Sequence, residues 1–175
     1  NSIITWSINK DQGFFFRPYK MQGQPLNKGF IGFGSGQYEA TGAISGGYHR
    51  GMYWMYDVAT AKIITVNSQQ GSSDALTFKE YDMPEFYYSA SFLDSLQLIA
   101  SGRDDMEEKL HRIQLPSLKI LSAYGSYSNP PGKTPLSTWR ESFTAFIFNH
   151  PDLSIAAMAC RYTDQVDFID LKTGK

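Results

Sequence analysis

The sequence predicts an all-β fold, and this prediction rests on composition and on repetition. The 175 residues include 3 Trp, 11 Tyr and 12 Phe together with 15 Gly and 8 Pro. Aromatic residues favour strands, and Gly and Pro favour the tight turns that join them. A pattern of strand and turn residues also recurs roughly every 57 residues along the chain.

The clearest repeat is a strand that runs into a turn, at residues 55–62, 112–119 and 168–175. In each copy two apolar residues flank a polar one, and a Thr or Ser and a final Lys follow at fixed offsets. The alternation predicts a strand, and the polar residues after it predict a turn.

Two further columns of residues precede this strand. Phe33, Phe92 and Phe148 each close a short aromatic or small-residue run, which predicts the first strand of each copy. Residues 96–103 and 153–161 are nearly continuous apolar runs that end in Arg. Such runs are typical of strands covered on both faces, so we expect them to be equivalent second strands.

The pattern predicts four strands in each full repeat. The second strands should turn back into third strands at residues 110–115 and 166–171, and fourth strands follow at 62–66 and 119–124. The third copy ends where its fourth strand should begin, and residues 2–6 resemble that missing strand. Four short antiparallel strands in each unit form the blade of a β-propeller.

We therefore predict about three blades in a single partial propeller domain over residues 1–175. The blades are expected at residues 26–66, 84–124 and 141–175, with residues 1–9 as a strand of an adjoining blade. A β-sandwich with coincidental similarity between the copies is the alternative fold.

One segment argues against this pattern. In residues 104–113 the acids come before the bases, and Met106, Leu110 and Ile113 recur at helical spacing, which is typical of a short helix. The repeat instead makes residues 104–108 an exposed hairpin loop. We predict the loop.

The last half of the chain resembles a known family. Residues 149–156 (NHPDLSIA) lead to residues 166–175 (VDFIDLKTGK), with a weaker copy at residues 92–119. This pattern is similar to that of the TolB-like, six-bladed β-propeller proteins common among secreted and lipid-anchored proteins of Bacteroidetes. The resemblance implies about six blades, so this chain looks like half of a propeller. It also implies a location in the periplasm or at the cell surface, whereas these motifs specify architecture and no activity.

Charge and hydropathy exclude several classes of function. The chain carries 16 Lys and Arg against 17 Asp and Glu, a net charge of -1, which gives no electrostatic reason to expect nucleic acid. No apolar stretch approaches the roughly 20 residues that cross a bilayer. The lone Cys160 cannot form an internal disulfide and is expected to behave as a small buried apolar residue.

Few residues form patterns with known chemistry. His49, His111 and His150 are scattered, so we expect no metal site, and no phosphate-binding loop indicates a cofactor. A serine nucleophile on a strand-to-helix turn is also not seen in the sequence. We interpret His150 as a turn residue.

The better functional candidates are polar and aromatic residues where strands end, because loops carry binding residues on a rigid scaffold. Arg offers a planar fork for carboxylate or phosphate, and Trp and Tyr offer flat apolar contact. The competing interpretation is that these Arg and Asp residues pair with one another between blades. The candidate binding residues are His49, Arg50, Arg103, Asp104, Trp139, Arg140, Glu141, Arg161, Tyr162 and Asp164.

The favoured function is a non-enzymatic binding or scaffolding module of an extracytoplasmic propeller, with a protein or a small polar ligand as its partner. One alternative is a propeller-type hydrolase or lyase that acts on sugars or lactones, with Glu141, His150 or Asp164 as the acid or base. Another is a carbohydrate-binding β-sandwich that uses exposed Tyr and Trp.

An arc of about three blades would leave a strand edge and a blade face uncovered at each end. The chain is therefore expected either to be a piece of a larger protein or to associate through its terminal blades, most simply as a symmetric pair.

Overall fold

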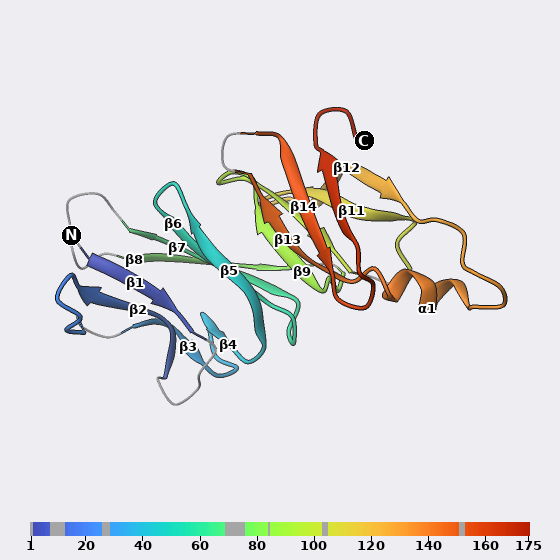
Figure 1. Cartoon of the computed structure of the whole chain (residues 1–175). Coiled ribbons are helices and arrows are strands. Elements are labelled where there is room, and N and C mark those ends of the chain that lie inside the picture. The colour runs from blue at the N-terminus through green and yellow to red at the C-terminus, as the bar shows by residue number, and fades with distance from the viewer. Residues whose placement is uncertain are drawn as a thin grey trace. The chain divides into compact units, whose positions relative to one another are not determined.

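The computed structural model describes residues 2–7, 13–25, 29–68, 76–83, 85–102, 105–150 and 153–175. Over these ranges the chain forms fifteen strands and one short helix, which confirms the all-β prediction. The chain divides into two compact units, Asn1–Asp82 and Met83–Lys175, and each contains two small sheets (Figure 1).

The first unit contains two four-stranded sheets. One has the order β1 (Ser2–Trp6), β2 (Phe14–Lys20), β3 (Phe30–Phe33) and β4 (Glu39–Ala40). The other has the order β5 (Ala43–His49), β6 (Met52–Asp57), β7 (Lys62–Ser68) and β8 (Leu76–Asp82). Aromatic and aliphatic side chains from both sheets, among them Phe16, Phe30, Met55 and Ile64, form one buried cluster.

The second unit has one four-stranded and one three-stranded sheet. The former contains β9 (Ser89–Phe92), β10 (Gln97–Ser101), β11 (Glu108–Gln114) and β12 (Lys119–Ser126). Helix α1 (Leu136–Glu141) precedes the latter, which contains β13 (Ala145–Asn149), β14 (Ile155–Cys160) and β15 (Val166–Asp170). Leu110 and Tyr124 of the first sheet pack with Met158 and Ile169 of the second.

Strand order distinguishes blades from a sandwich. In all four sheets the strands lie side by side in the order in which they occur in the chain. Neighbours are antiparallel except for the two-residue pairing of β3 with β4. Sandwiches instead use Greek-key connections that move strands between sheets. The four sheets are thus of the blade type, and the sandwich alternative is wrong.

The repeated turn has the same backbone conformation in its three copies. Its penultimate residue is left-handed each time, with φ of 52° at Ala61, 57° at Leu118 and 76° at Gly174. The amide of Leu118 donates to the carbonyl of Gln114, and the amide of Gly174 donates to the carbonyl of Asp170, each at 2.7 Å. The repeat read from the sequence is therefore a structural repeat.

The predicted hairpins of the second and third copies are confirmed. Strands β10 and β14 lie within the two apolar runs, and each pairs antiparallel with the next strand, β11 or β15. The helix alternative is wrong, because residues from Glu108 onward form β11. Leu110 and Ile113 are both fully buried in that strand, which shows that its sheet is covered on both faces. A strand covered on both faces need not alternate apolar with polar residues. The helical spacing of the apolar residues in this segment is therefore coincidental.

The first copy differs from its expected boundaries. Phe33 ends β3 in one sheet, whereas residues 55–66 lie in β6 and β7 of the next, so the segment 26–66 crosses two sheets. Residues 2–6 do form a strand, but β1 pairs with β2 within its own sheet. Strand β8 was not expected from the repeat. The third copy has three strands, as predicted.

Candidate functional site

One end of the second unit gathers most of the candidate residues. At this end β9, β11, β13 and β15 begin and β10, β12 and β14 finish, as the sequential antiparallel order requires. We call it the rim. It comprises Tyr88, Ser101, Lys109, residues 127–144, Cys160, residues 161–165 and Asp167. Of the sequence candidates, Trp139, Arg140, Glu141, Arg161, Tyr162 and Asp164 lie on it.

Arg161 lies between two tyrosine rings on the rim. Its Cζ is 5.0 Å from the ring centroid of Tyr88 and 5.1 Å from that of Tyr162, within the range of cation–π attraction. One guanidinium nitrogen donates to the Tyr88 hydroxyl. We call these three residues the arginine clamp. Tyr162 is 62% exposed, so the clamp is open to solvent.

The arginine clamp carries the positive charge of Arg161. Within the described ranges, Arg161 forms no ion pair with a carboxylate. The backbone amide of Arg161 donates to the carbonyl of Thr144 at 2.8 Å, which fixes the position of the residue. The ring of Tyr88 also packs edge-on against Phe146 at 5.8 Å. Because Asp104 lies outside the described residues, the interpretation that Arg and Asp residues pair with one another stays a prediction for Arg161.

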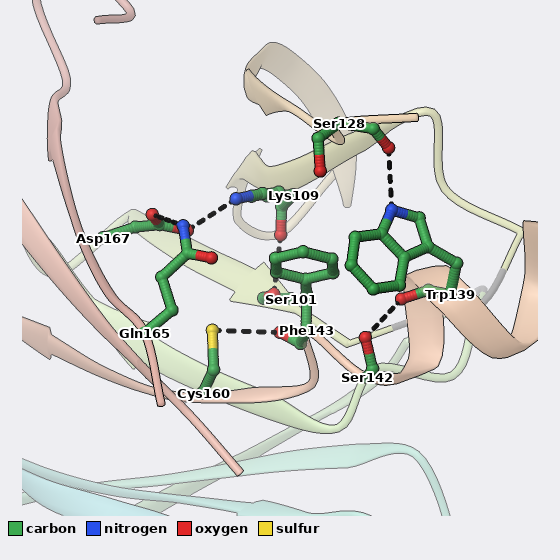
Figure 2. A network of polar contacts seen from close by, with 9 residues as sticks. All are labelled: Ser101, Lys109, Ser128, Trp139, Ser142, Phe143, Cys160, Gln165 and Asp167. Carbon is green, nitrogen blue, oxygen red and sulfur yellow. Dashed lines mark hydrogen bonds and ion pairs between the residues drawn. The ribbon is translucent and has the colours of Figure 1, made fainter. Parts of the chain in front are cut away.

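A buried ion pair lies deeper in the rim (Figure 2). Lys109 Nζ is 2.6 Å from Asp167 Oδ2, with side-chain exposures of 9% and 20%. The ammonium also lies 4.4 Å from the ring centroid of Phe143, and the side-chain amide of Gln165 donates to the other oxygen of Asp167. Burying a charge is costly unless it is paired and hydrogen-bonded. The pair therefore joins β11 to β15 and leaves neither charge uncompensated.

Sequence reasoning missed this pair. Lys109 falls between the loop predicted at residues 104–108 and the third strand predicted at residues 110–115, whereas Asp167 falls within the third strand predicted at residues 166–171. The repeat aligns Asp167 with His111 rather than with Lys109. A contact between non-equivalent positions of two sheets leaves no signal in a repeat pattern.

Cys160 lies beside the buried pair but is not an activated thiol. Its Sγ is 3.8 Å from the carbonyl oxygen of Phe143. Burial raises the pKa of the thiol, and the Asp167 carboxylate raises it further, while Thr163 and Lys109 act in the opposite direction. The thiol is therefore protonated at neutral pH, whereas reactive cysteines need a lowered pKa.

The residues of α1 hold the rim together. The indole of Trp139 donates to the carbonyl of Ser128 at 2.7 Å and packs at right angles on Phe143, on the side away from Lys109 (Figure 2). Arg140 Cζ is 5.7 Å from the ring centroid of Tyr127. Burial raises the pKa of Tyr127 to about 12, although Arg140 opposes the shift. Trp139 and Arg140 thus contact neighbouring residues of the chain, and Glu141 is exposed.

The other candidates lie elsewhere. His49 and Arg50 are in the β5–β6 hairpin of the first unit, where Arg50 is exposed with φ of 45°. Arg103 and Asp104 lie outside the described residues. His150 is in the β13–β14 hairpin, at the opposite end of the sheet from the rim. There its Nδ1 accepts the backbone amide of Leu153 at 3.0 Å, as a turn residue would.

The described ranges contain no group of three or more His, Cys, Asp or Glu side chains arranged to hold a metal ion. They also contain no helix of the length and apolar character needed to span a bilayer.

Comparison with known proteins gives a structural likeness only. No family model and no curated protein matches the sequence. The fold is similar to the solved structure of a "putative exported protein" from Bacteroides fragilis, with a TM-score of 0.60 and 12% sequence identity. The likeness covers 95% of this chain and 51% of that one, so the chain spans about half the length of its structural neighbour. At this identity the likeness establishes the fold alone, and the TolB-like resemblance stays a prediction.

Proposed function

We propose that this chain is a non-enzymatic binding module of an extracytoplasmic, TolB-like propeller protein, and that the arginine clamp is its main ligand contact. The blade-type sheets support the propeller assignment. The exported character given to the structural neighbour supports a location in the periplasm or at the cell surface.

The observation that carries the proposal is the exposed guanidinium of Arg161 between two aromatic rings, without a described carboxylate partner. The cation–π contacts with the Tyr88 and Tyr162 rings and the hydrogen bond to the Tyr88 hydroxyl restrict the long side chain before a ligand arrives, so less conformational freedom is lost on binding. A guanidinium fork matches a carboxylate, and the tyrosine rings add flat contact surface. The ligand class that fits is a small polar molecule, or a protein segment, that carries a carboxylate.

The placement of the acid and base candidates separates His150 from the other two. Glu141 and Asp164 are exposed on the rim, whereas His150 lies beyond the five residues of β13 at the other end of the sheet. A strand of that length spans roughly 16 Å, too far for His150 to share a proton transfer with either carboxyl group.

Calorimetric titration with two matched oligosaccharides tests the proposal. The acidic probe is trigalacturonate, and the neutral probe is α-1,4-galactotriose, which has hydroxymethyl groups in place of the carboxylates. We expect the protein to bind the acidic probe at least about tenfold more tightly, because only that probe can pair with the guanidinium fork. Arg161→Lys keeps the charge but loses the fork and the stacking, so it should weaken binding about tenfold or more.

Arg50→Lys is the control variant, since it makes the same change at an exposed arginine of the first unit. It should leave the affinity unchanged. Equal affinity for the two probes, or equal losses in the two variants, would refute the clamp as the ligand contact.

A further inference from the structure

A row of aromatic side chains lies where the two sheets of the first unit pack together. Strand pairing aligns Tyr48 of β5 with Tyr53 of β6, and the centroids of the two rings are 4.9 Å apart. The Tyr53 ring lies 5.1 Å from that of Phe30 and 5.8 Å from that of Phe16, both in the other sheet. The buried phenylalanines therefore hold Tyr53 in place, and Tyr53 supports Tyr48.

Trp6 of β1 extends this row across a glycine of β5. A Cβ atom at Gly46 would lie 3.1 Å from the indole nitrogen of Trp6, so the glycine makes room for the indole against the strand. Tyr48 follows Gly46 by two residues, on the same face of β5 and about 7 Å further along. Trp6, Tyr48 and Tyr53 therefore form one continuous surface, which we call the aromatic platform.

The aromatic platform is open to solvent, and its polar groups are unused. Tyr48 is 61% exposed and Trp6 39%, while Tyr53 is half-buried. Among the described residues, the indole N–H of Trp6 and the hydroxyls of Tyr48 and Tyr53 have no hydrogen-bond partner. Burial raises the pKa of Tyr53, and Tyr48 raises it further, so this hydroxyl stays a donor at neutral pH. The platform thus offers flat apolar contact, three donors and no charge.

These properties distinguish between the ligand classes that stack on aromatic rings. A sugar ring places C–H groups against an aromatic face and hydroxyls at its edge, so it uses both the rings and the polar groups. A quaternary ammonium also binds aromatic faces, but it has no acceptor for the three donors. A proline-rich segment supplies carbonyl acceptors, but proline has no N–H to donate to the tyrosine oxygens. An uncharged sugar therefore fits best.

We propose that the aromatic platform is a binding site for a neutral oligosaccharide, built from different residues than the arginine clamp. One sugar ring stacks on Trp6 and the next on Tyr48, and hydroxyls at their edges pair with the indole N–H and the tyrosine hydroxyls. The chain then has two kinds of site, one that binds a carboxylate at the clamp and one that binds an uncharged sugar at the platform.

Calorimetric titration of the complete chain with cellotetraose tests the proposal. This probe is uncharged, and its glucose units carry their ring substituents equatorially, so C–H groups cover both faces of each ring. We expect saturable binding at millimolar concentration or below. Tyr48→Ala should weaken binding about tenfold or more, and Tyr48→Phe, which loses only the hydroxyl, should weaken it less. Because Tyr48 is exposed, the far-ultraviolet circular dichroism spectra of both variants should not change.

Phe86→Ala is the matched control, since Phe86 is an aromatic residue of the second unit that is 51% exposed. It should bind cellotetraose like the unaltered chain. No binding of cellotetraose, equal losses in Tyr48→Ala and Phe86→Ala, or tighter binding of choline or of a decaproline peptide would overturn the proposal. Arg161→Lys should bind cellotetraose unchanged, and Tyr48→Ala should keep its preference for trigalacturonate over galactotriose. Failure of the platform and failure of the clamp are therefore separate results.

Discussion

At the scale of single residues, Asp57 shows how one buried side chain can organise a turn. Its Oδ1 accepts the amides of Gly42 at 2.9 Å and Ala59 at 3.0 Å, and its Oδ2 accepts the amide of Thr41 and the hydroxyl of Thr60 at 2.9 and 3.0 Å. The residue is fully buried. It therefore ties the start of β5 to the β6–β7 turn.

Replacing Asp57 should be among the most destabilising changes in the first unit. Asp57→Ala leaves buried donors without acceptors, so we expect the free energy of unfolding in urea to fall by about 3 kcal/mol or more. Asp94→Ala is the control, because that carboxylate accepts the amide of Leu96 in an exposed turn. Its effect should stay below about 1 kcal/mol. If both variants lowered the free energy of unfolding by the same small amount, the hydrogen bonds to Asp57 would contribute little to stability.

Candidate site residues were only partly predictable at this scale. The sequence indicated Arg161 and Tyr162 because they follow an apolar strand, and they form two thirds of the arginine clamp. Tyr88, the third member, lies 73 positions away in the chain, so no local pattern could join it to them. Lys109 and Asp167 are likewise far apart in the chain, by 58 positions, so no local pattern could join them either.

At the scale of elements, the repeated turn gives the sharpest test. Ala61 and Gly174 occupy equivalent left-handed positions, a conformation that costs a residue with a Cβ atom roughly 1 kcal/mol or more. Ala61→Gly should therefore raise the free energy of unfolding by about 0.5–1 kcal/mol, and Gly174→Ala should lower it by a similar amount. The measurement is urea denaturation of both variants. Changes of the same sign would show that the two turns are not energetically equivalent.

Repetition also decided which elements the sequence could predict. Strands β10, β11, β12, β14 and β15 belong to columns that recur, and their positions were predicted within a few residues. Strands β3 and β4 pair in parallel over only two residues, and Glu39 binds back to the amide of Gly36 to close the connecting turn. A connection of this kind has no counterpart in the other copies, so the boundary of the first copy could not be found by alignment.

At the scale of the whole molecule, each unit has the features of an independently folding part. In Met83–Lys175, a cluster that includes Ile99, Leu110, Met158 and Ile169 spans both sheets. Polar contacts tie the same two sheets at both ends. Lys109 pairs with Asp167 on the rim, and the side-chain amide of Asn149 donates to the carbonyl of Phe92 at the other end at 2.6 Å.

We therefore expect residues 83–175, produced alone, to fold without the first unit. The fragment has a core of its own and a size within the usual range for domains, so it should unfold cooperatively in urea and keep a near-ultraviolet circular dichroism signal from its packed aromatic residues. Ile169→Ala in the fragment should lower the free energy of unfolding by about 2–4 kcal/mol, because it truncates a buried side chain that packs against both sheets. A fragment with strand content but no cooperative transition would show instead that its core depends on residues 1–82.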